Sequence, residues 1–320
     1  MRASSGRLGE AAPQGNGMKL TELRYVVAVA REGHFGRAAV SCHVSQPTLS
    51  VAIRKLEDEL GVTLFERGKN EVFVTPLGQQ IVEQAQATLA SVEQIRHIAE
   101  HGKDQLTGPL RLGVIFTIAP YLLPRLIPLL SERAPDMPLL IDENYTDVLG
   151  KRLQHGDLDA LILALPYDAP SVQTEVCYQE ELVVVVPAQH PWRRRASIRA
   201  EELGRENVLL LGPGHCFRDQ VLRLCPDLAQ TASNGTVQRI LQGGSLETIR
   251  YMVATGAGVS VLPQDAIDAV PQTQELVAAV PLAGPRPYRE VGLAWRKDFY
   301  RPQAATLLRK AVQDCRQAPV

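Results

Sequence analysis

The chain has 320 residues, of which 45% are hydrophobic and 22% are charged, so it is long enough for two domains and too apolar to be disordered. Its formal net charge of −1 offers no overall attraction for nucleic acid, so any DNA contact must come from a local surface. No apolar run approaches the ~20 residues of a membrane helix, and five cysteines are too few for a secreted disulfide scaffold. We therefore expect a cytoplasmic protein with no membrane partner. Residues 1–17 lack the apolar segment of a secretory signal, and we interpret them as a disordered leader or a start assigned too early.

Residues 19–60 show helical periodicity, and the pattern predicts three short helices. Gly33 ends the first of them. Ser45 is placed as the N-cap of the third, with Pro47 in the first turn, where its missing N–H has little effect. Two short extended stretches flank residues 67–70, which predicts a β-wing.

The third helix has an apolar face for packing and a polar face that is free to bind. A helix of ~10–12 Å diameter fits the ~12 Å major groove of B-DNA, and its N-terminal residues can reach base edges. Gln46 can pair with adenine, and Thr48 can place its methyl group against thymine. We predict that residues 18–76 form a winged helix-turn-helix domain that binds double-stranded DNA, with a plain three-helix bundle as the alternative. The candidate DNA contacts are Ser45, Gln46, Pro47, Thr48, Ser50, Arg54 and, on the wing, Lys69.

Residues 77–107 contain one long helical pattern, with an apolar seam from Ile81 to Ala99. The sequence offers no neighbouring helix to cover this seam. We predict a linker helix that pairs with the same helix of a second chain, which would give a homodimer. Packing of the seam on the chain's own C-terminal domain is the alternative.

From residue 108 onward, short strands alternate with helices, which predicts an α/β domain over residues 108–320. This alternation is typical of a parallel-rich sheet with helices on both faces. The elements form two series, and the last elements return to the first. We therefore predict two lobes around a cleft, resembling periplasmic binding proteins, with lobe I at 108–180 and 284–320 and lobe II at 181–283.

Three segments carry a specific pattern, and they read HFGRAAVSCHVSQPTLSVAIRKLEDELGVTLFER (34–67), EELVVVVPAQHPW (180–192) and GGSLETIRYMVATGAGVSVLP (243–263). They resemble the LysR-type family of transcriptional regulators. The resemblance covers nearly everything from Met18 to about Arg309, and it implies a winged helix-turn-helix, a linker helix and a two-lobed effector domain. One position departs from the family pattern, because the residue after Ser50 is often basic in this family and here it is Val51.

A second set of motifs is GHCFRD at 214–219 with a further cysteine at 225, TIAPYLLP at 117–124 and GLAWR at 292–296. These resemble the peroxide-responsive branch of the same family. The resemblance implies that Cys216 is the sensing thiol and Cys225 the resolving thiol of an intramolecular disulfide. It implies a peroxide pocket of Thr117, His215, Asp219, Arg296 and, less strongly matched, Thr146.

The same resemblance implies a role and partners for the whole protein. Hydrogen peroxide would be the signal, and the response would mainly activate oxidative-stress genes. The partners would be promoter DNA, RNA polymerase and further copies of the chain in a dimer of dimers.

The residues around Cys216 support reactivity in their own right. Cys216 follows a Gly-Pro-Gly turn and opens a predicted helix, so the helix N-terminus would stabilise its thiolate, as would a nearby His215 or Arg296. A thiolate attacks peroxide to give a sulfenic acid, which a second thiol can convert to a disulfide. If residues 217–224 are helical, the two sulfurs lie ~13 Å apart along the axis. A disulfide needs Cα atoms within ~7 Å, so it would require this helix to unwind.

Other interpretations remain. Cys216 and Cys225 can be ordinary small buried residues in a regulator that binds an organic effector between its lobes. A thiol peroxidase-like enzyme is less favoured, because turnover gives no reason for a DNA-binding domain. Two cysteines and one adjacent histidine leave a tetrahedral zinc site incomplete. We expect no metal, no cofactor and no enzymatic activity.

Overall fold

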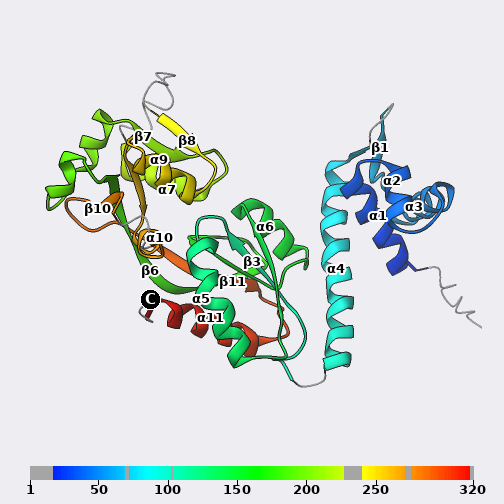
Figure 1. Ribbon diagram of the computed structural model, residues 1–320. Coiled ribbons are helices and arrows are strands. Elements are labelled where there is room, and N and C mark those ends of the chain that lie inside the picture. Colours follow the sequence, from blue (N-terminus) through cyan, green and yellow to red (C-terminus); the bar gives the residue numbers. More distant parts are fainter. Residues whose placement is uncertain (1–16, 69–71, 102–103, 227–239, 271–274, 318–320) are drawn as a thin grey trace, which may run out of the picture. The chain divides into compact units, whose positions relative to one another are not determined.

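The computed structural model describes residues 17–68, 72–101, 104–226, 240–270 and 275–317. The chain divides into two compact units, Met1–Glu93 and Gln94–Val320, and each is described by itself (Figure 1). The division falls within the long helix α4 (Pro76–His101). Within the part of the chain that is described, no helix is long and apolar enough to cross a membrane.

The first unit is a helix-turn-helix with a short β-wing. Its elements are α1 (Leu20–Glu32), α2 (Phe35–Ser41), α3 (Gln46–Leu60), β1 (Phe65–Arg67) and β2 (Val72–Val74). The three predicted helices and the wing are confirmed, and β1 pairs with β2 in antiparallel fashion. Gly33 and Gly61 end α1 and α3 with φ of 59° and 67°, a left-handed conformation that glycine adopts without strain.

Side chains fix both ends of α3. Ser45 is the N-cap as predicted, and its Oγ accepts a hydrogen bond from the backbone N–H of Thr48 at 3.3 Å. Near the other end, Glu57 Oε1 accepts from the backbone N–H groups of Leu64 and Phe65 at 2.7 and 3.2 Å. The wing is therefore attached directly to α3.

Helix α4 uses its apolar seam in two different ways. Val82 and Ala85 are each 3% exposed and belong to the core of the N-terminal unit, and Ile81 packs against that core. Further along, Ile95 and Ile98 are 66% and 50% exposed. The start of the seam thus completes the helix-turn-helix core, a role that neither sequence-based alternative assigned to it.

The second unit is built on a sheet of seven strands in the order β10-β6-β11-β5-β3-β4, with β9 also paired to β6. A separate parallel pair is formed by β7 and β8. The strands are β3 (Leu110–Ile115), β4 (Leu139–Asn144), β5 (Ala160–Leu165), β6 (Val172–Pro187), β7 (Val208–Leu211), β8 (Ile240–Gly243), β9 (Ser260–Pro263), β10 (Val277–Pro281) and β11 (Tyr288–Arg296). The helices are α5 (Ala119–Arg133), α6 (Thr146–Gln154), α7 (Cys216–Leu224), α9 (Leu246–Ala254), α10 (Gln264–Asp268) and α11 (Pro302–Gln317), with short 3-10 helices at Pro191–Arg194 and Ala200–Arg205.

The prediction of a parallel-rich sheet is wrong. Strand β3 is parallel to β4 and β5, but β11 is antiparallel to both β5 and β6, and β6 is antiparallel to β9 and β10. Strand β6 makes most of the antiparallel pairs, because it runs from Val172 to Pro187 and pairs with β9, β10 and β11. The first ten residues of β6 expose several polar side chains, so they do not read as a buried strand.

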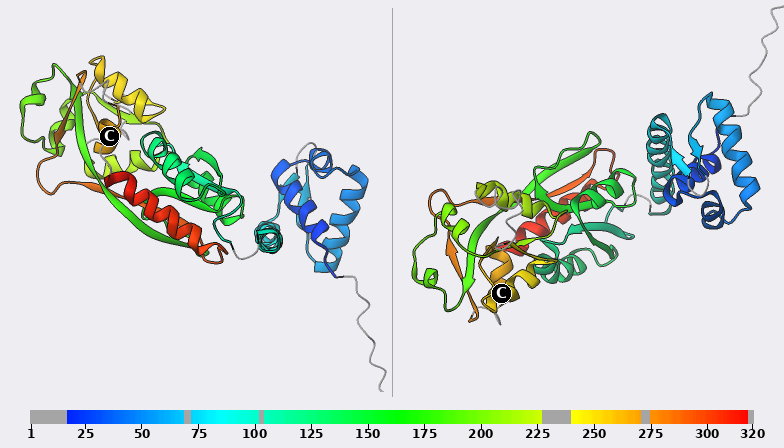
Figure 2. Two further views of the ribbon diagram at one scale, coloured as in Figure 1. Left: turned by 60° about the horizontal axis from the view of Figure 1, so that its bottom comes forward. Right: turned by 90° about the horizontal axis from the view of Figure 1, so that it is seen from above.

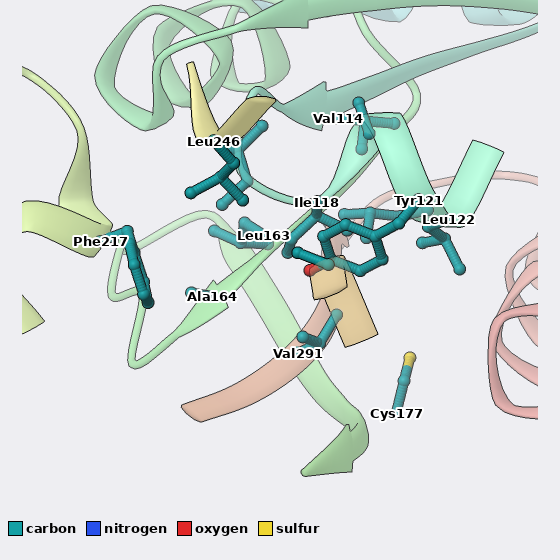
Figure 3. Packing of buried hydrophobic residues seen from close by; sticks show 14 of the residues in the cluster. Val114, Ile118, Tyr121, Leu122, Leu163, Ala164, Cys177, Phe217, Leu246 and Val291 are labelled. Carbon is teal, nitrogen blue, oxygen red and sulfur yellow. The ribbon is translucent and has the colours of Figure 1, made fainter. Parts of the chain in front are cut away.

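Strand β6 connects the two halves of the second unit. Its residues 172–181 pair with β11, and residues 182–187 pair with β9 and β10. Helices α5 and α11 pack against each other beside this sheet (Figures 1 and 2). One buried cluster extends through both halves and includes Val114 and Leu163 as well as Phe217 and Leu246 (Figure 3).

Candidate functional site

A small recess lies at the carboxyl ends of the neighbouring parallel strands β3 and β4, where helices α6 and α7 begin. Ligands in α/β folds commonly bind at this edge of a sheet. The empty volume of the recess is about 160 Å³. Four predicted pocket residues come together there: Thr117, Thr146, His215 and Cys216. The complete lining is Ile115, Phe116, Thr117, Asn144, Tyr145, Thr146, Gly214, His215 and Cys216.

Cys216 is the first residue of α7, with His215 at the N-cap position, so the prediction that this cysteine opens a helix is confirmed. Its side chain is half-buried and its thiol is free. The preceding Gly214 has φ of 95°, which permits the tight turn into the helix. A helix N-terminus carries partial positive charge on its backbone N–H groups, and reactive cysteines are commonly found at such positions.

Two threonine hydroxyls face the same recess. Thr146 Oγ1 is buried and has no hydrogen-bond partner among the described residues, which is uncommon for a buried polar atom. Thr117 is 2% exposed, and its Oγ1 accepts a hydrogen bond from Arg289 Nη1 at 3.1 Å. Because a hydroxyl that accepts can still donate its own proton, both threonines can bind a small oxygen-containing ligand.

His215 is 5% exposed and lies beside the rings of Phe116 and Tyr145. Burial lowers the pKa of His215 below its ordinary value, against the smaller raising effect of its backbone hydrogen bond with Gly244. The imidazole is therefore neutral near pH 7. A neutral His215 supplies no positive charge to Cys216.

Cys225 stands at the opposite end of α7, where it is the C-cap and 1% exposed. The helix between the two cysteines is present as predicted, and nine residues at ~1.5 Å per residue separate them by ~13 Å. Cys216 and Cys225 are not joined in a disulfide, so the pair is in the reduced arrangement. Elsewhere, burial raises the pKa of Cys177 to about 11 and also raises that of Cys315, which makes these two thiols unreactive at neutral pH.

Arg289 is a site residue that the sequence analysis missed. It lies on β11, is 3% exposed, and donates from Nη2 to the backbone oxygen of Thr117 at 2.7 Å, besides its bond to the hydroxyl. Glu180 faces Arg289 from the neighbouring strand β6, and Arg289 Nε donates to Glu180 Oε2 at 2.5 Å. Arg289 Nη2 also donates to Tyr121 Oη at 2.7 Å. The guanidinium carbon lies 4.8 Å from the ring centroid of Phe217, the residue after Cys216. Arg289 therefore links the wall of the recess to the helix that carries the cysteine.

Two predicted pocket residues do not line the recess. Arg296 is at the other end of β11, seven residues or ~23 Å from Arg289, and its Nη1 donates to the backbone oxygens of Leu153 and Leu158 at 2.8 and 2.9 Å. Asp219 is exposed in the first turn of α7. Along a strand, alternate residues point to the same face. Arg289 therefore points to the same face of β11 as Val291, Leu293 and Trp295, and Arg296 points to the opposite face. That alternation was the available signal for choosing between the two arginines.

The candidate DNA-binding residues lie at the start of α3 and on one exposed side of it. Ser45, Gln46, Pro47, Thr48 and Arg54 are exposed, and Ser50 is half-buried. Ser45 and Thr48 share a hydrogen bond between their hydroxyl groups at 2.8 Å, which leaves the Thr48 methyl group for base contact. Val51, which replaces the basic residue common in the family, is 68% exposed. Lys69 lies outside the described residues.

Comparison with known protein families identifies the class of protein. Residues 20–79 match the bacterial regulatory helix-turn-helix proteins of the lysR family, and residues 103–316 match the LysR substrate binding domain. The chain belongs to the LysR family of transcriptional regulators. The predicted combination of a winged helix-turn-helix with an α/β effector domain is confirmed.

Within this family, the chain is similar to OxyR proteins of several bacteria. The DNA-binding transcriptional dual regulator OxyR of Escherichia coli is 39% identical over 279 residues, covering 87% of this chain and 90% of that protein. A full-length OxyR variant from Pseudomonas aeruginosa is 49% identical, with a TM-score of 0.75 over 93% of this chain and 96% of that one. A cysteine mutant of Corynebacterium glutamicum OxyR with hydrogen peroxide bound is 32% identical, with a TM-score of 0.60 over 93% and 92% of the two chains.

Proposed function

We propose that this chain is a transcriptional regulator that senses hydrogen peroxide through Cys216 and alters its action on promoter DNA in response. One observation carries the proposal: a half-buried cysteine at a helix N-terminus shares a small recess with the buried Thr146 hydroxyl, which has no partner among the described residues. The similarity to OxyR of several bacteria supports the same signal.

The chemistry has two steps. The Cys216 thiolate attacks one oxygen of hydrogen peroxide, so an S–O bond forms while the O–O bond breaks, and the departing hydroxide takes a proton to become water. The Thr117 and Thr146 hydroxyls would hold the two peroxide oxygens, and Arg289 would keep Thr117 in place. The Cys225 thiolate then attacks the sulfenic sulfur and displaces a second hydroxide, which also becomes water. The sum is two thiols and one peroxide converted to one disulfide and two waters.

The second step supplies the signal. Cys225 cannot reach Cys216 across a nine-residue helix, so α7 has to unwind before the disulfide closes. Unwinding removes Phe217 from the Arg289 guanidinium and from the buried cluster. A change in a shared core is the kind of event that shifts a two-state protein.

We propose that the signal passes from an effector domain at residues 108–320, through a linker helix at 77–107, to a DNA-binding domain at 18–76. We also propose that the protein is cytoplasmic. The exposed Ile95 and Ile98 support self-association through α4, and a dimer of dimers would place several recognition helices along one promoter. RNA polymerase is the further partner of an activator. We propose no turnover as an enzyme, since the oxidised cysteine pair is itself the output.

An organic effector is the weaker candidate. Pockets for such ligands usually measure roughly 300–1,000 Å³, and the recess at Cys216 is far smaller than that.

The test of the redox function is peptide mapping by mass spectrometry under non-reducing conditions, after brief titration with hydrogen peroxide. We expect a 216–225 disulfide to form with about one equivalent of peroxide and no sustained peroxide consumption. Continued consumption with a thiol reductant present would instead indicate a peroxidase. A peroxide response that survives Cys216→Ser would show that another residue is the sensor.

DNA recognition is tested separately. Gln46→Ala should weaken binding to the cognate promoter by about 1–3 kcal/mol and relax base preference at one position. Non-specific DNA of the same length is the control, because its phosphate contacts do not involve base recognition. Equal affinity of variant and wild type for the cognate promoter would remove Gln46 from the interface.

A further inference from the structure

Three aromatic rings form one side of the recess. Tyr145 and His215 have ring centroids 4.8 Å apart, Phe116 and Tyr145 are 5.2 Å apart, and Phe116 and His215 are 6.0 Å apart, all with strongly tilted planes. Edge-to-face packing of this kind is favourable and holds each ring in place. The rings come from three separate segments, so together they fix the width of the recess.

Tyr145 is the outermost of these rings. It is 37% exposed, whereas His215 behind it is 5% exposed. It also lies over the turn that leads to the cysteine, since a Cβ atom added to Gly214 would be only 3.3 Å from Tyr145 Cε1. Tyr145 thus packs against the start of the Gly214–Cys216 turn, beside the half-buried Cys216.

The recess behind this ring has little room. Nine residues line it, and its polar side chains include Thr117, Asn144 and Thr146 beside the three rings. Hydrogen peroxide is about as small as two waters and needs hydrogen bonds at both of its oxygens. An alkyl hydroperoxide carries a carbon group on one oxygen, and that group would have to occupy the space that the Tyr145 ring fills.

We infer that Tyr145 is a specificity-determining residue, which admits hydrogen peroxide to Cys216 and excludes alkyl hydroperoxides. The inference rests on the proposed peroxide-sensing function. With either oxidant the thiolate attacks the terminal O–H oxygen, an S–O bond forms and the O–O bond breaks. The leaving group is hydroxide from hydrogen peroxide and an alkoxide from an alkyl hydroperoxide, and each takes a proton to become water or alcohol.

The test compares rates of Cys216 sulfenic acid formation with hydrogen peroxide and with tert-butyl hydroperoxide, measured by intact mass in a Cys225→Ser background. In the Tyr145→Ala variant the ratio of the hydrogen peroxide rate to the tert-butyl rate should fall at least tenfold, since even one methylene in a fitted pocket changes selectivity by 10–200-fold. Tyr145→Phe keeps the ring and should keep the ratio. Val148→Ala removes an exposed apolar side chain of α6 that lies three residues after Tyr145 and does not line the recess. This control variant should also keep the ratio of the two rates.

Two results would overturn the inference. If Tyr145→Ala changes both rates by the same factor, the ring supports the local structure without selecting among peroxides. If Tyr145→Phe lowers the ratio as much as Tyr145→Ala, the hydroxyl is responsible and size exclusion by the ring is not. Failure of the underlying function looks different, because Cys216 would then react with neither oxidant in the wild-type protein.

Discussion

The two ends of helix α7 carry the same residue type in opposite surroundings. At the N-terminal end, Cys216 is half-buried and lines a small recess together with Thr117 and Thr146. At the C-terminal end, Cys225 is 1% exposed and belongs to the hydrophobic core. The first environment leaves the thiol accessible to a small oxidant, and the second shields the thiol from solvent. The helix therefore separates the chemistry of sensing from the structural change that follows it.

The middle of α7 connects these two environments. Phe217 is 2% exposed and packs on Arg289, whose hydrogen bonds reach both Thr117 in the recess and Glu180 on β6. Any movement of the helix toward disulfide closure thus disturbs a buried ion pair at the strand that joins the two halves of the unit.

The largest effect is expected from exchanging one cysteine at a time. Cys216→Ser should abolish the peroxide response, because no other cysteine combines access with a helix N-terminus. Cys225→Ser should stop the reaction at the sulfenic acid, which a dimedone-type probe followed by mass spectrometry will detect. If Cys225→Ser also fails to form sulfenic acid, Cys225 is required for the first oxidation step, and the two ends of α7 do not act separately.

Part of this arrangement could be predicted from the sequence. The Gly-Pro-Gly turn and the helical pattern after it located the start of α7, and the LysR resemblance gave the architecture. The grouping of Thr117 and Thr146 with Cys216 came from resemblance alone, because it depends on β3 and β4 being parallel neighbours. Nothing in a single sequence specifies that pairing.

The choice between Arg289 and Arg296 failed for a related reason. Both flank the same apolar strand, and their roles depend on which face of β11 packs against α5. Glu180, the partner of Arg289, lies in the first part of β6, where exposed polar side chains hide the pattern of a buried strand. A buried ion pair across two strands is invisible when one strand is missed.

The second prediction concerns this ion pair. Arg289→Met should lower the free energy of unfolding by about 3–5 kcal/mol, because it leaves the Glu180 carboxylate buried without its partner. Burial already raises the pKa of Glu180, against the lowering effect of Arg289. Urea unfolding of the full chain at pH 7 measures the loss.

The double variant Arg289→Met with Glu180→Leu is the matched control. A well-packed apolar pair of similar size often replaces a buried ion pair at little net change, so the double variant should recover most of the lost stability. Equal destabilisation of the single and double variants would show that Arg289 acts through packing, with no contribution from charge.

A third and smaller effect is expected at Phe217. Phe217→Leu should lower the free energy of unfolding by about 1 kcal/mol, since it keeps an apolar side chain in the core but loses the ring over Arg289. If unwinding of α7 limits disulfide closure, this corresponds to roughly a fivefold faster second step. The rate of sulfenic acid formation at Cys216 serves as the internal control and should stay the same. Equal acceleration of both steps would mean that α7 is not an independent barrier between its ends.

The smallest predicted effect is a pH dependence at the N-terminal end of α7. Burial lowers the pKa of His215 in the folded protein, so the unfolded chain takes up a proton first as the pH falls. The stability contributed by the neutral imidazole is full above the ordinary histidine pKa of about 6.5 and decreases as the pH falls toward the lowered folded value. The free energy of unfolding should therefore drop more between pH 8 and pH 5.5 in the wild type than in His215→Gln, in which this proton uptake is absent. Carboxylates such as Glu180 and Asp265, whose folded pKa values are raised, contribute equally to both proteins and cancel in the difference. A wild-type decrease that is no larger than that of His215→Gln would mean that the imidazole is not desolvated at the recess, and the Tyr145 and Phe116 rings would then not exclude water from it.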